Sequence, residues 1–238
     1  MSGYFYAIGG ANYDKKESYI IDLDIIAQTH KKHPSILLIT AANNDNINKT
    51  SSIIHYFESL GCNVGVLKSD NVNIEDVEAL FEENDIIYLC GGITSRLVEY
   101  AEKINLHKML INAYNNGKII VGVSAGAILF FDYGYGDKDA YFYNLESVNH
   151  KIVNGLGIFN GVFCPHYQNN GLLSFHEEIK KYNLNGFALE NGTALKIKND
   201  DFTLIKSKGT SGFIFRYEND HKLEYLKDSS LYKISLFK

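Results

Sequence analysis

The chain has 238 residues, 45% of them hydrophobic and 21% charged, and its net charge is −5 at pH 7. These values are typical of a globular protein that builds its own core, and we expect residues 1–238 to form a single domain without a nucleic-acid surface. No apolar run approaches the roughly 20 residues that span a bilayer, and the polar start of the chain is unlike a signal peptide, so the sequence predicts a cytoplasmic protein with no membrane partner.

Short apolar runs alternate with segments of helical spacing through the first half of the chain. We expect strands at residues 4–8, 35–40, 63–67, 85–89 and 118–123, and helical segments at 16–30, 49–60, 73–81 and 94–115. This alternation predicts an α/β fold in which helices cover both faces of a mostly parallel sheet. Ligands bind beyond the carboxyl ends of the strands in such sheets, where this chain places Gly9-Gly10, Thr40-Ala41-Ala42, Gly91-Gly92 and Gly122 to Gly126. Tight turns are the alternative explanation for any one of these glycine pairs.

The second half of the chain has a different pattern. Residues 131–144, FDYGYGDKDAYFYN, have no helical period and are expected to form an irregular excursion of roughly 20 residues. Its tyrosines have three interpretations, namely a pocket lining, a homodimer contact and the packing of a loop onto the domain. From Gly186 the apolar period becomes two, and Asn191-Gly192 between two such runs indicates a hairpin. We therefore expect the last fifty residues to add antiparallel strands to the same core.

Residues 118–130, KIIVGVSAGAILF, read as a strand, a sharp turn and a helix. Ser124 lies in this turn within a G-x-S-x-G pentapeptide, whose glycines remove the side chains that would clash there. It is the candidate nucleophile, and a plain strand-to-helix turn is the alternative. The backbone N–H of Ala125 directly after it is one candidate oxyanion donor, and the N–H of Gly92 is the second.

A serine hydroxyl needs a base, and that base needs an orienting group. His166 follows a predicted strand at the same edge of the sheet as Ser124 and is the candidate base, although a structural histidine is the alternative. Three carboxylates are candidates for the orienting group: Asp137 and Asp139 in the excursion, and Glu190 at the start of the Asn-Gly turn.

Cysteine and histidine spacing argues against metal chemistry. The three cysteines, Cys62, Cys90 and Cys164, form no C-x-x-C pair, which disfavours a disulfide framework or a zinc site. His30 and His33 can share a helix face, but no carboxylate or cysteine cluster accompanies them. We expect neither a metal nor another cofactor.

Four segments together resemble the dipeptidase E and cyanophycinase group of serine peptidases: YLCGGITSRL at 88–97, GVSAGAILF at 122–130, FCPHYQ at 163–168 and, more weakly, GFALENGTAL at 186–195. The resemblance implies a flavodoxin-like fold related to class I glutamine amidotransferase domains, with serine in place of cysteine at the turn. It also implies hydrolysis of peptide bonds through an acyl-enzyme.

Matching the motifs position by position makes Ser124 the nucleophile and His166 the base, with an oxyanion hole from Gly92 and Ala125. Relatives differ in the third residue of the triad. A glutamate in the strand after the histidine matches Glu190, which we prefer, and an aspartate about fifteen residues after the serine matches Asp139.

Two departures from the family pattern concern substrate specificity. Ile93 stands where the family usually has asparagine, and Gln168 follows where many relatives carry an acidic residue. The leading hypothesis is a serine-type exopeptidase or dipeptidase that acts on short peptides. The alternatives are a catalytically silent protein that binds peptides or amino acids, and a hydrolase or esterase for small molecules that uses the same serine.

Overall fold

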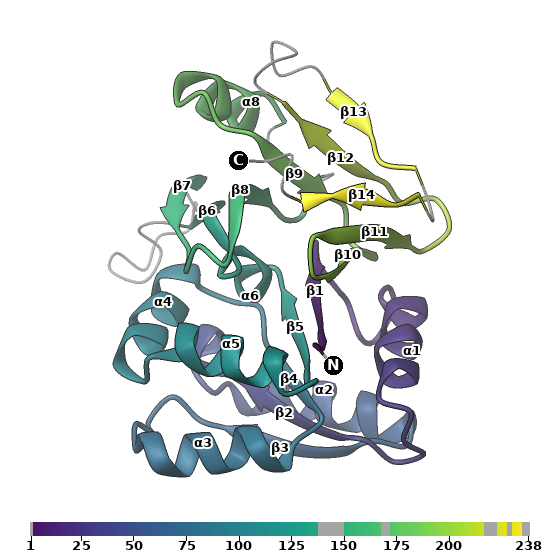
Figure 1. Ribbon diagram of the computed structural model, residues 1–238, viewed down its shortest axis with the longest axis vertical. Coiled ribbons are helices and arrows are strands. Elements are labelled where there is room, and N and C mark those ends of the chain that lie inside the picture. Colours follow the sequence, from purple (N-terminus) through teal and green to yellow (C-terminus); the bar gives the residue numbers. More distant parts are fainter. Residues whose placement is uncertain (1, 138–149, 168–171, 217–222, 228–229, 235–238) are drawn as a thin grey trace.

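A computed structural model describes residues 2–137, 150–167, 172–216, 223–227 and 230–234 (Figure 1). Its central sheet has eight strands in the order β14-β11-β10-β1-β5-β4-β2-β3. The five strands expected in the first half of the chain pair in parallel: β1 (Tyr4–Ile8), β2 (Ser35–Ile39), β3 (Asn63–Leu67), β4 (Ile86–Leu89) and β5 (Ile119–Val123). The other three are antiparallel: β10 (Thr193–Lys198), β11 (Asp201–Lys206) and β14 (Tyr232–Lys233). The expected α/β fold with a mostly parallel sheet is confirmed.

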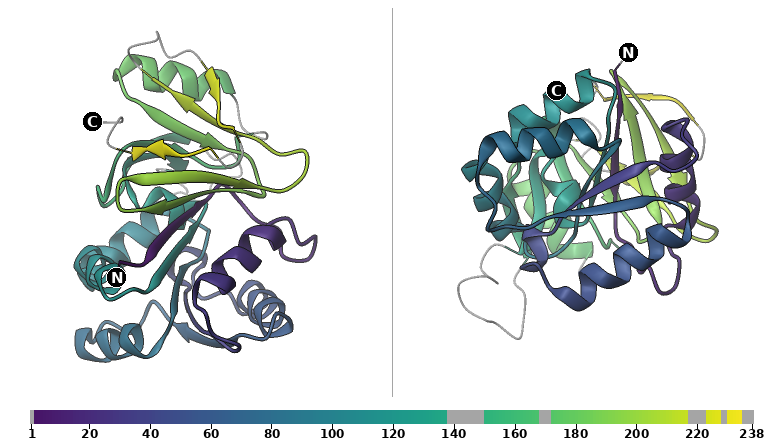
Figure 2. Two further views of the ribbon diagram at one scale, coloured as in Figure 1. Left: turned by 45° about the vertical axis from the view of Figure 1, so that its right-hand side comes forward. Right: turned by 90° about the horizontal axis from the view of Figure 1, so that it is seen from below.

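Two layers of helices enclose the parallel part of this sheet (Figure 2). Helices α1 (Tyr19–Gln28) and α2 (Ile47–Ser59) pack against Tyr6, Ile8 and the other side chains on one face. Helices α3 (Ile74–Glu83), α4 (Thr94–Lys103) and α5 (Leu106–Asn115) pack against Phe5, Ala7 and their neighbours on the opposite face. Because both faces are covered, β1, β2, β4 and β5 are apolar and buried at nearly every position, whereas the edge strand β3 is more exposed.

The predicted helical segment at 94–115 is two helices. Asn105 lies between α4 and α5 with φ of 53°, in the left-handed region that asparagine tolerates better than most residues. Asn73 caps α3, because its side chain accepts a hydrogen bond from the backbone N–H of Glu75. No helix in the described part of the chain combines the length and apolar character needed to cross a bilayer.

A second sheet of six strands, in the order β13-β12-β9-β8-β6-β7, lies above the central sheet in Figure 1. Its strands are β6 (Phe131–Asp137), β7 (His150–Asn154), β8 (Phe159–Cys164), β9 (Gly186–Leu189), β12 (Gly212–Phe215) and β13 (Leu223–Tyr225). Helix α8 (Leu172–Lys181) covers its outer face through Phe175 and Ile179, whereas Phe163 and Phe187 join the core beneath α4 and α5.

The expectation of an irregular excursion after Phe130 was wrong for the described residues. Residues 131–137 form β6 and pair with β7, while 138–149 lie outside the described residues. The glycines that suggested a loop permit close packing instead: a Cβ at Gly134 would lie 2.2 Å from Cγ2 of Ile128. Here β6 passes directly over the helix α6 (Ala125–Ile128).

The last fifty residues do not all join one sheet. Strands β10, β11 and β14 extend the central sheet, but β9, β12 and β13 belong to the second, and β9 pairs in parallel with β8. The hairpin expected at Asn191-Gly192 was therefore wrong, because this turn carries the chain from one sheet to the other. The buried pairing of β10 with β1, such as Ile8 with Ala194, determines the path of the chain here rather than the local turn signal.

Candidate active site

Ser124 connects β5 to α6 in a backbone conformation that is rare for a residue with a side chain. Its φ is 54° and its ψ is −112°. Glycines make this turn possible: a Cβ at Gly122 would lie 2.4 Å from the carbonyl oxygen of Gly126, and one at Gly126 would lie 2.3 Å from that of Leu89. The backbone N–H of Ser124 donates to the carbonyl of Ile8 at 3.0 Å, so β1 fixes the position of the turn.

His166 follows the end of β8 and brings the second sheet to Ser124. Its Nε2 lies 2.8 Å from Oγ of Ser124. The backbone N–H of His166 donates to the carbonyl of Gly9 at 2.9 Å, which ties the histidine to the loop after β1. A Cβ at Gly10 would lie 2.5 Å from the imidazole ring, so this glycine leaves space for the ring. The structure thus brings together the two residues that the sequence suggests as nucleophile and base.

The other nitrogen of His166 meets an amide. Its Nδ1 lies 2.7 Å from Oδ1 of Asn191, and Nδ2 of Asn191 donates to Oε2 of Glu17 at 3.3 Å. Since an ionised carboxylate only accepts hydrogen bonds, the NH₂ of Asn191 faces Glu17 and its oxygen faces the histidine. An amide oxygen must receive the Nδ1–H of the imidazole. Nε2 is consequently left as the acceptor for the Ser124 hydroxyl proton.

Of the three candidate carboxylates, Glu190 is engaged elsewhere and Asp137 is the last residue of β6. One carboxylate oxygen of Glu190 accepts a hydrogen bond from the backbone N–H of Ser211 at 2.7 Å, which joins β9 to the start of β12. Asp139 lies outside the described residues. In the sequence, Asn191 is recognisable only as a turn residue, and Glu17 lies far from the motifs. The recurrence of asparagine as the third residue in cysteine–histidine sites was the available signal for Asn191.

Two backbone N–H groups are available near the serine. Ala125 begins α6, and Gly92 follows β4 with φ of 153°. A Cβ at Gly92 would lie 2.2 Å from the carbonyl oxygen of Ala42, so a side chain does not fit there. Among the hydrogen bonds of the described residues, neither N–H acts as a donor. Both are therefore unengaged donors in this part of the structure, as an oxyanion hole requires.

A cavity of 440 Å³ opens beside Ser124 and His166. Its walls come from the segments after β1, β2, β4 and β5, at the carboxyl edge where a ligand was expected. Two charged side chains of opposite sign, Asp14 and Lys49, line it and are exposed. The remaining lining residues are Ala11, Asn12, Tyr13, Asn43, Ser52, Ile53, Gly91, Gly92 and Val123.

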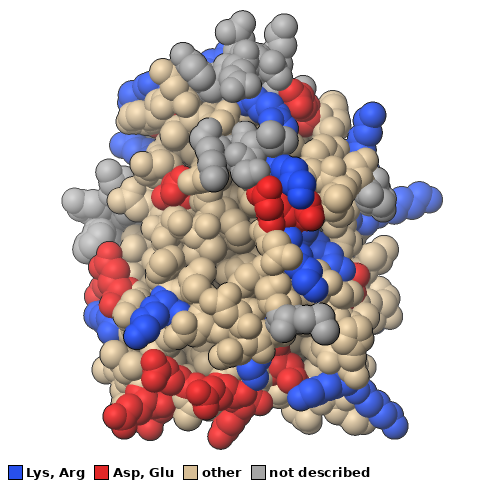
Figure 3. Space-filling view, viewed as in Figure 1, with Lys and Arg blue, Asp and Glu red and all other residues tan. Residues whose placement is uncertain are grey.

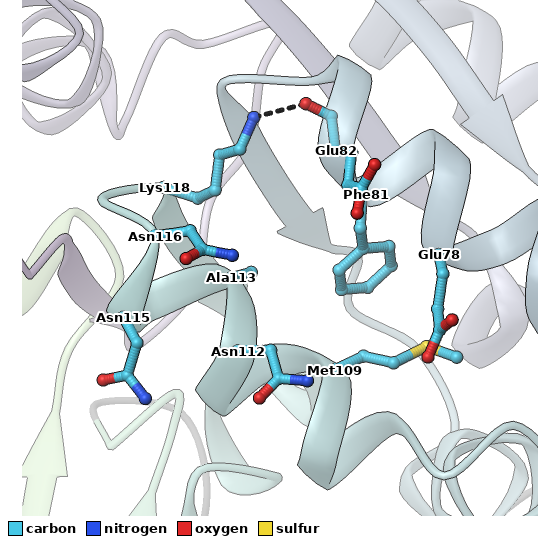
Figure 4. A pocket seen from close by; sticks show the side chains of 9 residues that line it. All are labelled: Glu78, Phe81, Glu82, Met109, Asn112, Ala113, Asn115, Asn116 and Lys118. Atoms are coloured by element: carbon cyan, nitrogen blue, oxygen red, sulfur yellow. Dashed lines mark hydrogen bonds between the residues drawn. The ribbon is translucent and has the colours of Figure 1, made fainter.

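A second cavity of 260 Å³ lies between α3 and α5 (Figure 4). Lys118 closes one end by donating to the carbonyl of Glu82 at 2.6 Å, and Phe81 and Met109 contribute apolar surface. Neither serine nor histidine is among its lining residues. Figure 3 shows acidic side chains gathered along the lower edge of this face. Helix α3 carries five acidic residues in its sequence: Glu75, Asp76, Glu78, Glu82 and Glu83. This cavity lacks the groups for acyl transfer, so the candidate active site is the one beside Ser124.

Known proteins match this chain over most of its length. The model of peptidase family S51 matches residues 5–205. The uncharacterized peptidase YgaJ of Bacillus subtilis (strain 168) is 30% identical over 207 residues, which cover 85% of this chain and 86% of that protein.

Two solved structures share the fold. One is a peptidase from an acI-B1 Actinobacterium, with a TM-score of 0.69, 19% identity and coverage of 98% of this chain and 97% of that chain. The other is a Listeria monocytogenes EGD-e protein that carries the name peptidase E, with a TM-score of 0.67, 17% identity and coverage of 87% and 100%. The resemblance to the dipeptidase E group is confirmed, and so is the expectation of a peptidase. The chain belongs to peptidase family S51.

Proposed function

We propose that this peptidase is a serine-type exopeptidase or dipeptidase that hydrolyses short peptides through an acyl-enzyme on Ser124. The observation that carries the proposal is the 2.8 Å contact between Oγ of Ser124 and Nε2 of His166 beside a cavity of 440 Å³. Histidine in this position accepts the serine proton during attack, which the hydroxyl needs because it is a weak nucleophile by itself.

The proposed reaction has two halves. Oγ of Ser124 attacks the scissile carbonyl while its proton passes to His166, and the N–H groups of Gly92 and Ala125 stabilise the negative oxygen that forms. The C–N bond then breaks as His166 gives the proton to the leaving amine. A water molecule repeats the sequence on the acyl-enzyme and releases the acid. Asn191, rather than Glu190 or Asp139, is the residue that we place third, because its oxygen faces Nδ1 of His166 at 2.7 Å.

The lining of the cavity supports a short substrate with free ends. Asp14 and Lys49 offer a carboxylate and an ammonium group at the same cavity, and a peptide of a few residues carries the opposite charges on its termini. We propose the cytoplasm as its location, since Cys62, Cys90 and Cys164 are free and buried, as is usual for proteins of reducing compartments.

The test compares wild type with Ser124→Ala on a library of dipeptides and dipeptide amides that includes N-terminal aspartyl and β-aspartyl members. We expect the variant to lose at least about a thousandfold in kcat/KM and to lose labelling by a fluorophosphonate. Ser59→Ala is the matched control, because Ser59 lies at the end of α2 and its hydroxyl bonds only to the carbonyl of Tyr56 in the described structure. Turnover that survives in Ser124→Ala contradicts the mechanism. A folded wild type that binds peptides without labelling or turnover favours the silent binding protein.

A further inference from the structure

Glu17 is held firmly against the turn that carries Asn191. Its carbonyl oxygen accepts a hydrogen bond from Oγ of Ser207 at 2.7 Å, and its backbone N–H donates to the carbonyl of Asn12 at 3.1 Å. A Cβ at Gly192 would lie 2.7 Å from the same carbonyl oxygen, which shows how closely the two segments approach. The carboxylate of Glu17 is thus directed to the amide of Asn191 by a backbone fixed on both sides.

This contact is made by the NH₂ end of the Asn191 amide, which leaves the oxygen end facing the histidine. If the amide turned over, its NH₂ would face Nδ1 of His166, and Nδ1 would have to accept. The imidazole proton would then sit on Nε2, which would no longer take the proton of Ser124. Such a turn would also place the amide oxygen against the Glu17 carboxylate, where two acceptors repel.

We propose that Glu17 is a positioning residue that keeps the Asn191 amide, and through it the His166 tautomer, in the state needed for catalysis. This inference rests on the proposed function of Ser124 and His166. The site is then a chain of four side chains, Ser124, His166, Asn191 and Glu17, in which a neutral amide separates the carboxylate from the imidazole. Glu190 does not substitute for Glu17, because its carboxylate is engaged by the N–H of Ser211.

The first measurement compares two substitutions of Glu17. Glu17→Ala removes the acceptor, and we expect kcat to fall about 30- to 100-fold with KM within about twofold of wild type, since a wrong imidazole tautomer affects the chemical step. Glu17→Gln keeps an oxygen acceptor for the amide and should restore kcat to within about fivefold of wild type. Equal losses in the two variants, or a loss that lies mainly in KM, would overturn the proposal.

The second measurement repeats Glu17→Gln in an Asn191→Asp background. An aspartate at this position faces the Glu17 carboxylate, and the two negative charges repel. There Glu17→Gln should raise kcat, because its NH₂ donates to the new carboxylate, whereas the same change lowers kcat when Asn191 is present. A role in folding alone predicts the same direction in both backgrounds, and that result would contradict the proposal.

The third measurement does not need turnover. The ¹⁵N chemical shifts of the His166 ring, assigned by their loss in His166→Gln, report the tautomer directly. We expect the Nδ1–H form in wild type and in Glu17→Gln, and a mixture of the two tautomers in Glu17→Ala. An unchanged tautomer in folded Glu17→Ala overturns the role of Glu17 even if the protein is active. A wild-type protein that shows the expected tautomers but hydrolyses no peptide would contradict the proposed function and not the role of Glu17.

Discussion

Asp22 on helix α1 carries a carboxyl group that is completely buried in the layer between α1, α2 and the sheet. One of its oxygens, Oδ2, accepts hydrogen bonds from Ser18 at 2.8 Å and Tyr56 at 2.7 Å. Among the described residues, no group bonds to Oδ1. Burial raises the pKa of this carboxyl from 3.8 to about 6, although the two hydrogen bonds oppose the rise.

This raised pKa predicts how stability changes with pH. The folded protein holds the proton of Asp22 more tightly than the unfolded chain does. Asp22 therefore contributes most to the free energy of unfolding below about pH 4. This contribution is lost as the pH rises through about 6. The difference between the pKa values of Asp22 in the folded and unfolded states corresponds to about 3 kcal/mol. We expect Asp22→Asn to be more stable than wild type by about 1–2 kcal/mol at pH 8, because the neutral amide still accepts from Ser18 and Tyr56.

Urea unfolding of Asp22→Asn and wild type at pH 4.5 and pH 8 measures this effect. The advantage of the variant should shrink or reverse at pH 4.5, where the wild-type carboxyl is protonated. Asp70→Asn is the control for the loss of one carboxylate, since Asp70 is exposed. Parallel stability curves for Asp22→Asn and wild type would show that this carboxyl does not titrate as described.

Single residues differ in how far the sequence could predict their place. Ser124 and His166 each follow a recognisable strand, and the sequence expects them at one edge of the sheet. The meeting of Asn191 with His166 depends instead on the pairing of β10 with β1, which sets where the Asn-Gly turn lies. Glu17 is separated from Asn191 by 174 positions and has no motif of its own. No local pattern reports a contact of this kind.

Among whole elements, the turn between β5 and α6 that carries Ser124 could be predicted from the sequence. The reason is that the glycines it requires lie within a few residues of Ser124. We expect Gly126→Ala to destabilise the protein by about 3 kcal/mol, because its Cβ would lie 2.3 Å from the carbonyl oxygen of Leu89 in β4 and backbone there cannot move freely. Gly65→Ala in β3 is the matched control, since its Cβ would meet its nearest neighbours at 3.8 Å.

Urea unfolding measures both glycine variants. Gly65→Ala should lie within about 1 kcal/mol of wild type, because the space is open and alanine restricts the unfolded chain. Similar losses in the two variants would mean that a general effect of replacing glycine by alanine, rather than contact with Leu89, determines the cost. A Gly126→Ala protein of wild-type stability would show that the backbone of the turn around Ser124 shifts at little cost to accept the extra methyl group.

Strand β6 is an element that the sequence did not predict. Glycine is depleted in strands, so Gly134 and Gly136 indicated a loop. Their packing against Ile128 depends on α6, which the chain has just formed, and on β8, which it forms about twenty residues later. Four of the five parallel strands were predictable because burial on both faces leaves a continuous apolar signal in each strand separately, whereas β3, at the edge of the sheet, is largely exposed or half-buried.

At the scale of the whole molecule, the candidate site joins both sheets. Ser124 follows β5 of the central sheet, His166 follows β8 of the second, and Asn191 lies in the segment between β9 and β10 that passes from one to the other. These strands are labelled in Figure 1. The inner face of the second sheet shares a core with α4 and α5 through Phe163 and Phe187. The site therefore exists only while the two sheets remain packed together.

This arrangement makes the expected single domain testable. The chain has 17 tyrosines and no tryptophan, so near-UV circular dichroism reports tyrosine packing, in the central sheet at Tyr88 and in the second at Tyr167. In a urea titration we expect this signal, far-UV circular dichroism and the fluorophosphonate labelling of Ser124 to change at one midpoint. The reason is that the segment carrying Asn191 joins β9 of the second sheet to β10, which pairs with β1 in the central sheet. Labelling lost at a lower urea concentration than the far-UV signal would mean that the second sheet opens first. Activity would then depend on the packing of the two sheets against each other. It would be lost, together with the contact between His166 and Ser124, at a urea concentration at which the rest of the fold remains intact.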